Sequence, residues 1–287
     1  MNNRYEITSK DIVYRKIKGT SLKARLYQPI GPGPFPAIVE VHGGAWTSND
    51  RTTNAPIHEA VAETGVVVMA IDFRMPPNNM FPDSITDTNH AIRWLKSRAN
   101  KLNIEATSVG ILGTSSGGHQ AILNALLPND PQYVDTTDTL KAMDGSVAFA
   151  ISCWSVLDPL ARYKMAIKQC NQRLVDAHHA FWPSEAAMRS GNPQLTIENN
   201  LQHKKPPILL LQGTADDNLP ADVAERFFHA YKTINGSVIL EKFKNQPHAF
   251  VGKDPSSAAS LRALNTINNF IHNQTESGQL KKEPELL

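Results

Sequence analysis

Short apolar runs recur along this chain of 287 residues, and they constrain its fold more than any other feature. They are rich in β-branched residues, apolar on both faces, and lie at 37–41, 66–71, 109–112, 147–153 and 208–211. Such runs are typical of buried, mostly parallel strands. Parallel strands need long crossover connections, and helical patterns lie between the runs at 56–64, 84–100, 120–127 and 221–233. The alternation predicts an α/β fold, with a mostly parallel central sheet and helices on both faces.

Three segments depart from this alternation. The stretch Ile12–Tyr27 alternates in short pieces and ends before a Gly-Pro turn, which predicts a hairpin of edge strands. Residues 156–202 hold no good buried strand and are rich in Met, His and aromatic residues, so we expect an inserted helical cap. The segment 275–287 is polar and charged, which predicts a disordered tail. Since no internal repeat or low-complexity linker interrupts them, residues 1–274 are expected to form a single domain.

Composition and charge exclude several classes of partner. Apolar residues make up 41% and charged residues 20%, as in folded globular proteins. Basic and acidic side chains number 29 and 27 without a basic block, so we expect no nucleic-acid partner. No apolar run is long enough to cross a bilayer, and residues 1–18 lack the apolar core of a signal peptide. We therefore expect no membrane partner and a cytoplasmic location, while the oligomeric state stays open.

The strongest chemical signal is Gly113-Thr114-Ser115-Ser116-Gly117, directly after the run 109–112. It has the form G-x-S-x-G, in which a sharp strand-to-helix turn holds a serine hydroxyl above the sheet. The chain passes close to itself there, so small residues are needed on both sides of the serine, and Gly113 and Gly117 fill these positions. Ser115 is therefore the candidate nucleophile.

A histidine and a carboxylate follow two of the predicted strands. A serine hydroxyl is a weak nucleophile at neutral pH, and it needs a histidine base that a carboxylate orients. Asp216 comes after the run 208–211, and His248 comes after a further predicted strand at 238–243. These positions predict a catalytic triad of Ser115, Asp216 and His248.

The motif His42-Gly43-Gly44-Ala45-Trp46 follows the run 37–41. Attack by a serine creates a tetrahedral oxyanion, and that charge needs N–H donors already in place. Glycines let a loop turn its amides inward without a Cβ in the way. We expect the oxyanion hole to consist of the backbone N–H groups of Gly44, Ala45 and Ser116.

Together these motifs resemble the α/β-hydrolase superfamily, in its branch of hormone-sensitive-lipase-type and ferulic-acid-esterase-like carboxylesterases. The resemblance spans roughly residues 22–272. The motif at 42–46 matches HGG-x-W, and 113–119 matches G-x-S-A-G-G-H with Ser116 where Ala is usual. Residues 213–220 resemble G-x-x-D-x-x-V-P, which places the acid at Asp216 and not at its neighbour Asp217. The resemblance implies a cofactor-free serine esterase on an α/β-hydrolase fold.

Aromatic residues of the HGG-x-W motif and in or under the expected cap are candidates for a substrate pocket, because caps lie over the carboxyl ends of the strands. These are Trp46, Trp154, Phe181 and Trp182, although core packing would explain the same residues. We expect no metal, because His178-His179 lacks a third ligand at suitable spacing. We expect no cofactor, because no glycine loop fits a dinucleotide or Walker pattern.

The expected function is hydrolysis of a small-molecule carboxylic ester through an acyl-enzyme. An arylformamidase or another small amidase would use the same residues, since HGG-x-W is shared with kynurenine formamidases. A non-catalytic binding module on the same fold is disfavoured, because such modules typically lose the Ser or the His. The acyl chain, the alcohol and the ester-versus-amide preference stay open.

Overall fold

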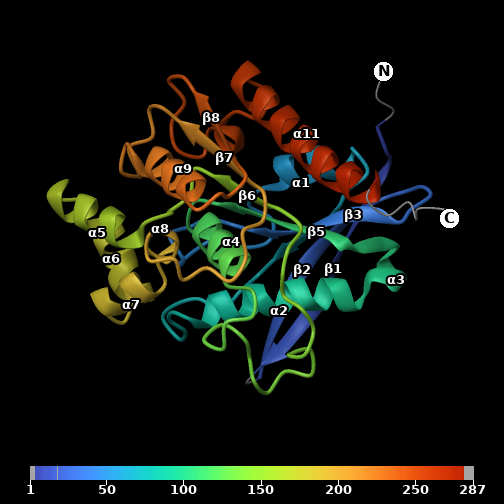
Figure 1. Ribbon diagram of the computed structural model, residues 1–287, viewed down its shortest axis with the longest axis horizontal. Coiled ribbons are helices and arrows are strands. Elements are labelled where there is room, and N and C mark those ends of the chain that lie inside the picture. The colour runs from blue at the N-terminus through green and yellow to red at the C-terminus, as the bar shows by residue number, and fades with distance from the viewer. Residues whose placement is uncertain (1–3, 18, 281–287) are drawn as a thin grey trace.

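A computed structural model describes residues 4–17 and 19–280, with side chains described to 275. Within these residues, eight strands form one sheet in the order β1-β2-β4-β3-β5-β6-β7-β8 (Figure 1). β1 (Ile7–Ile17) and β2 (Thr20–Pro29) form the predicted edge hairpin, and β2 also pairs antiparallel with β4 (Val67–Ile71). All other pairs are parallel, and they join β4, β3 (Phe35–Val41), β5 (Ile104–Thr114), β6 (Ala150–Cys153), β7 (Ile208–Gly213) and β8 (Val238–Phe243). The predicted α/β fold is confirmed.

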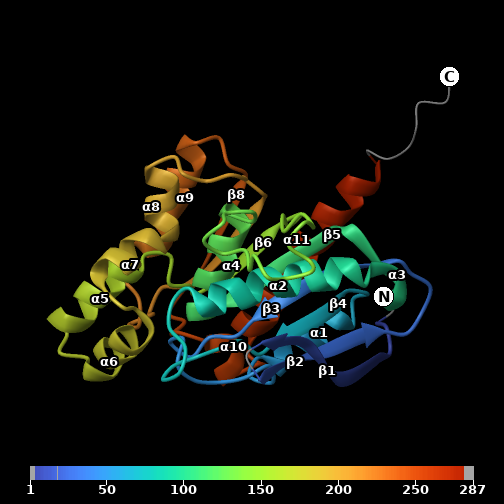
Figure 2. The ribbon, with the colours of Figure 1, turned by 90° about the horizontal axis from the view of Figure 1, so that it is seen from below.

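Two groups of helices flank the sheet (Figures 1 and 2). One group packs around α11 (Ala258–Leu280) and contains α1 (Ala55–Ala62) and α10 (Phe250–Lys253). The other contains α2 (Asp83–Ser97), α3 (Ala99–Leu102), α4 (Ser116–Leu126) and α9 (Val223–Thr233). Every residue of α4 is buried, since this helix lies between the centre of the sheet, α2 and α8. The turn that opens α4 is consequently held on all sides.

The helical cap is built from the chain between β6 and β7. It contains α5 (Pro159–Lys168), α6 (Gln172–Phe181), α7 (Glu185–Ser190) and α8 (Pro193–Glu198). In Figure 2, α5, α6 and α7 project at one end of the molecule, whereas α8 lies beside α9. The chain thus returns from the projecting helices to the sheet through α8.

The expected tail at 275–287 requires a correction. Helix α11 continues to Leu280, so residues 275–280 are helical. Ala263, Ile267 and Ile271 recur at helical spacing and are fully buried, which anchors the helix on the domain. The polar composition of residues 275–280 is thus compatible with the continuation of a helix that is anchored at earlier positions. Residues 281–287 lie outside the described part of the chain.

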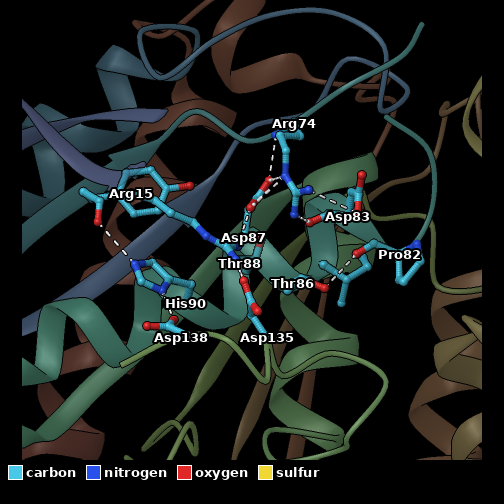
Figure 3. Close-up of polar contacts among 12 residues, drawn as sticks. Arg15, Arg74, Pro82, Asp83, Thr86, Asp87, Thr88, His90, Asp135 and Asp138 are labelled. Atoms are coloured by element: carbon cyan, nitrogen blue, oxygen red, sulfur yellow. Dashed lines mark hydrogen bonds and ion pairs between the residues drawn. The ribbon is translucent and has the colours of Figure 1, made fainter. Parts of the chain in front are cut away.

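Buried ion pairs connect the edge strand β1, the end of β4 and helix α2 (Figure 3). Asp87 of α2 is fully buried and accepts hydrogen bonds from Arg15 Nη1 at 2.5 Å and Arg74 Nε at 2.9 Å. Arg15 also pairs with Asp135. Each charge in this group, which we call the Asp87 cluster (Arg15, Arg74, Asp87 and Asp135), has a partner of opposite sign. The cluster therefore fixes the loop that follows β4 against α2.

Candidate active site

Ser115 occupies the sharp turn between β5 and α4. Its backbone has φ 52° and ψ −119°, a left-handed conformation that costs energy for a residue with a Cβ. A Cβ at Gly113 would lie 2.4 Å from the carbonyl oxygen of Gly117, and one at Gly117 would lie 2.0 Å from that of Val41. Both positions need glycine because backbone passes directly over them. The sequence thus builds a strained turn that presents the serine side chain at the carboxyl end of the sheet.

The structure brings the three predicted triad residues together. The Ser115 hydroxyl lies 2.9 Å from His248 Nε2, and His248 Nδ1 lies 2.8 Å from Asp216 Oδ2. A neutral imidazole with its proton on Nδ1 donates to Asp216 and accepts from Ser115. The Asp216 side chain is 2% exposed and that of His248 is 15% exposed. This arrangement can remove the serine proton and hold it beside a buried carboxylate.

Two neighbours that the sequence analysis did not single out fix the Asp216 carboxylate. Gln212 Nε2 donates to Oδ2 at 3.0 Å, and the backbone N–H of Asn218 donates to Oδ1 at 2.9 Å. Asp217 is exposed and its side chain has no hydrogen bond within the described residues. The geometry therefore distinguishes the two adjacent acids in the direction that the motif predicts.

The loop after β3 arches over the same turn. Gly44 has φ 112°, Ala45 φ 50° and Trp46 φ 65°, so three successive residues are left-handed. A Cβ at Gly44 would lie 2.2 Å from the carbonyl oxygen of Ser48. The Ser116 hydroxyl accepts a hydrogen bond of 3.1 Å from the Trp46 N–H, which ties the loop to α4. Serine at position 116, where the resembling family usually has alanine, thereby gains a role in holding this loop.

The backbone N–H groups of Gly44, Ala45 and Ser116 make no hydrogen bond among the described residues. Gly44, Ala45 and Ser115 line one cavity of about 290 Å³, together with His248. A buried N–H group is normally paired, so unpaired donors beside a cavity are available to a bound molecule. A larger hollow of about 590 Å³ lies between α1 and α11 and contains none of the predicted site residues.

The pocket prediction requires a correction. Of the four aromatic candidates only Trp154 lines the cavity. The rings of Trp46 and Phe181 stack at 5.1 Å with an interplanar angle of 4°, and the Trp182 ring lies 5.7 Å from that of Trp46. These three side chains are at most 2% exposed, because they fill the interface between cap helix α6 and the loop after β3. They hold the cap on the domain.

His119 belongs to the same interface. Its Nδ1 lies 3.2 Å from Trp46 Nε1, and its Nε2 lies 2.7 Å from the carbonyl oxygen of Gly191. A neutral ring satisfies both contacts, because Nε2 donates to the carbonyl while Nδ1 accepts from the indole. Burial lowers the pKa of His119 to about 4, which keeps it neutral at physiological pH.

Arg162 of cap helix α5 is a cavity residue that the sequence analysis missed. It is 1% exposed, and its Nε and Nη2 donate to the carbonyl oxygen and the Oδ1 of Asn218 at 3.1 and 2.5 Å. Nη1 is buried without a hydrogen-bond partner in the described residues. Since Asn218 also donates to Asp216, an unbroken chain of contacts leads from the cap to the three clustered residues. Nothing in the cap sequence marks this arginine among the other basic residues.

Two further features are absent from the described residues 4–17 and 19–280. No group of three or more His, Cys, Asp or Glu side chains there is placed to hold a metal ion. No helix in those ranges is long and apolar enough to span a membrane.

Several known proteins are similar to this chain in sequence. The probable carboxylic ester hydrolase LipM of Mycobacterium tuberculosis is 28% identical over 220 residues, which cover 76% of this chain and 50% of LipM. The isoprenylcysteine α-carbonyl methylesterase ICME of Arabidopsis thaliana is 23% identical, over 89% of this chain and 60% of its own. The chain spans about half the length of the first curated relatives that it matches.

Among solved structures, the propionate-bound esterase Est2 of Thermogutta terrifontis has a TM-score of 0.75 and 25% identity, with 94% of each chain covered. An esterase from Pyrobaculum calidifontis has a TM-score of 0.78 and 20% identity, over 94% of this chain and 87% of its own. The BD-FAE family model matches residues 26–231, a range that includes Ser115 and Asp216. The chain therefore belongs to the BD-FAE family and has the α/β-hydrolase fold.

Proposed function

We propose that this protein is a serine hydrolase that cleaves carboxylic esters through an acyl-enzyme. The observation that carries the proposal is the hydrogen-bonded series from Ser115 through His248 to Asp216, beside a cavity. The names of the relatives support an ester as the substrate, since they describe a carboxylic ester hydrolase, esterases and a methylesterase.

The reaction begins when Ser115 Oγ attacks the ester carbonyl and its proton passes to His248 Nε2. Asp216 holds the imidazole in the reactive tautomer and stabilises the imidazolium. The tetrahedral intermediate collapses as the C–O bond to the alcohol breaks, and the alcohol leaves with the proton from His248. Water then attacks the acyl-enzyme by the same route, which releases the acid and restores the Ser115 hydroxyl.

The N–H groups of Gly44, Ala45 and Ser116 are the proposed donors to the oxyanion. They come from two elements, the loop after β3 and the start of α4. The hydrogen bond from the Trp46 N–H to the Ser116 hydroxyl connects these two elements. Preorganised donors of this kind are each worth about 10²–10³-fold in kcat. Because none of the described residues accepts a hydrogen bond from these three amides, they are free to bind an oxyanion, which supports the assignment.

The test compares wild type with Ser115→Ala on nitrophenyl esters of increasing acyl length. We expect Ser115→Ala to lower kcat by about 10⁴–10⁶-fold, with an unchanged circular dichroism spectrum. A kcat close to that of the wild type in this variant would refute the proposed nucleophile. N-formyl-kynurenine in the same panel tests the amidase alternative, which would gain support only if its kcat/KM exceeded that of every ester.

A further inference from the structure

The cavity beside Ser115 contains a buried cation with an unused donor. Arg162 lines this cavity and is 1% exposed. Its Nε and Nη2 contact Asn218, a neutral residue, and its Nη1 has no partner in the described part of the chain. Burying a charge without a counter-charge is costly, so such a group usually has a partner.

The other buried arginines have the partners that Arg162 lacks. Arg15 and Arg74 each pair with the carboxylate of Asp87, as Figure 3 shows. Arg93 has no carboxylate, but each of its three guanidinium nitrogens donates to an oxygen, among them the carbonyls of Pro128 and Lys141. Of these four arginines, only Arg162 has a buried guanidinium nitrogen without a hydrogen-bond partner among the described residues. Its guanidinium carbon lies 5.6 Å from the centroid of the Trp46 ring, a contact that leaves Nη1 without an acceptor oxygen.

The rest of the cavity wall does not neutralise this charge. Arg173 of α6 also lines the cavity, and no Asp or Glu is among the described lining residues. Arg173 is exposed to solvent and has no ion pair within the described residues, so the wall carries a second positive charge at its outer side. The nearby carboxylate of Asp216 already accepts from Gln212, Asn218 and His248.

We propose that the cavity accepts esters that carry a carboxylate, and that Arg162, assisted by Arg173, binds this carboxylate. A planar guanidinium is well suited to a carboxylate, and Arg162 combines a place in the cavity wall with a nitrogen that has no hydrogen-bond partner among the described residues. This inference rests on the proposed ester hydrolysis and adds the class of substrate. Burial lowers the pKa of Arg162 to about 9, with the charge of Arg173 acting in the same direction, so the guanidinium stays protonated at neutral pH.

The first experiment measures charge preference with matched pairs of esters. In the first pair, monomethyl glutarate carries a carboxylate on the acyl side, and methyl pentanoate is its neutral counterpart. In the second pair, 4-acetoxybenzoate carries the carboxylate on the leaving group, and its methyl ester is the neutral counterpart. Each kcat/KM is divided by the uncatalysed rate of that ester. In at least one pair we expect the wild type to prefer the anion by about 10–100-fold, the value of a hydrogen bond to a charged group.

The second experiment assigns the preference to Arg162. Arg162→Met should remove most of it, whereas Lys168→Met, which removes an exposed cation from the same helix, should retain it. Arg162→Lys should keep part of it, because the charge remains but the planar donor pair is lost. If Arg162 only holds Asn218, Arg162→Met will lower both members of a pair by the same factor, and that result would overturn the proposal.

A third measurement needs no turnover. Glutarate should raise the Tm of the wild type and of Ser115→Ala, but not that of Arg162→Met. Hydrolysis of the neutral esters without any preference for the anions would refute this inference and leave the proposed function standing. Failure to hydrolyse any ester, together with a glutarate effect that depends on Arg162, would refute the proposed function and leave the anion site standing. A Tm that glutarate leaves unchanged in the wild type would contradict the anion site.

Discussion

Two clusters of buried polar residues in this molecule differ in whether their hydrogen-bond donors and acceptors are all paired. In the Asp87 cluster, two arginines and two aspartates neutralise one another inside the protein (Figure 3). Around Ser115, the Asp216 carboxylate and the His248 imidazole are also paired, but the Arg162 Nη1 and three backbone N–H groups have no partner in the part of the chain that the structure describes. Those unpaired groups belong to residues that line the cavity or border it.

A structural cluster of polar residues differs from a functional one in how many of its hydrogen-bonding groups are satisfied within the protein. Both contain buried charges, so burial alone does not separate them. A structural cluster satisfies its donors and acceptors internally, because any unsatisfied group lowers stability. A binding site retains unsatisfied groups that the substrate completes. Substitutions in the Asp87 cluster should therefore affect stability, and those around Ser115 should affect catalysis.

The largest contrast is expected at two adjacent acids. Asp216→Asn should lower kcat by about 10²–10⁴-fold, because the imidazole is no longer held in the reactive tautomer. Asp217→Asn should lower it less than about tenfold, since an exposed charge contributes only about 0.3–1 kcal/mol. Steady-state kinetics on one short-chain ester measures both. Near-full activity of Asp216→Asn would show that this carboxylate does not orient His248.

The Asp87 cluster should show the opposite pattern. Asp87→Ala leaves Arg15 without one counter-ion and Arg74 without its buried carboxylate partner, and breaking a buried pair costs about 3–5 kcal/mol. Urea unfolding should show this loss, while kcat of the folded fraction stays close to that of the wild type. A variant of normal stability and impaired kcat would place Asp87 in the functional class instead.

Two tryptophans test the boundary between core and cavity. Trp182→Ala should lower the free energy of unfolding by about 3–5 kcal/mol and leave the ratio of kcat/KM for short and long acyl esters unchanged, because Trp182 does not line the cavity. Trp154→Ala should change that ratio about tenfold, since a lost apolar contact is worth about 1–3 kcal/mol. Equal changes of this ratio in the two variants would show that Trp182 also contacts the substrate.

Acid should weaken the interface between cap and domain. The pKa of His119 falls from 6.5 to about 4 on burial, so only the unfolded chain gains this proton between those values. Its contribution to stability is complete above about pH 6.5 and declines towards pH 4, by roughly 1–3 kcal/mol.

Urea unfolding across this pH range measures the effect. The slope of stability against pH should be smaller in His119→Gln than in the wild type, and unchanged in the exposed control His229→Gln. Equal slopes in all three proteins would mean that His119 is not neutral and buried in the way described.

The fold could be predicted from the sequence because its signals are local. A run such as 208–211, apolar on both faces, has few alternatives to a buried strand. At Gly113 and Gly117 the backbone passes so close that any Cβ would collide with it, so only glycine fits there. The sequence predicts the end of the domain at 274, although helix α11 continues to Leu280, because residues 275–280 are mostly polar. A single sequence does not show which side of such a segment meets the sheet.

Parts of the site depend on contacts between distant segments and could not be predicted. Trp182 and Trp154 look alike in sequence, and only the packing of α6 on the loop after β3 separates core from cavity. Arg162 contacts Asn218, 56 positions away along the chain, and only this contact between distant segments identifies it as a residue of the site. Asn218 itself follows Asp216 closely enough to have been a candidate.

The most direct test of the account is the site of covalent labelling by a fluorophosphonate, which reacts with activated serines. Mass spectrometry of the digested wild-type protein should find a single adduct, on Ser115. The Ser115→Ala variant should take up no label, and labelling of His248→Gln should be slowed in proportion to its loss of esterase activity. An adduct on another residue, or one on Ser115 that forms equally fast without His248, would contradict the assignment of Ser115 as a nucleophile activated by His248.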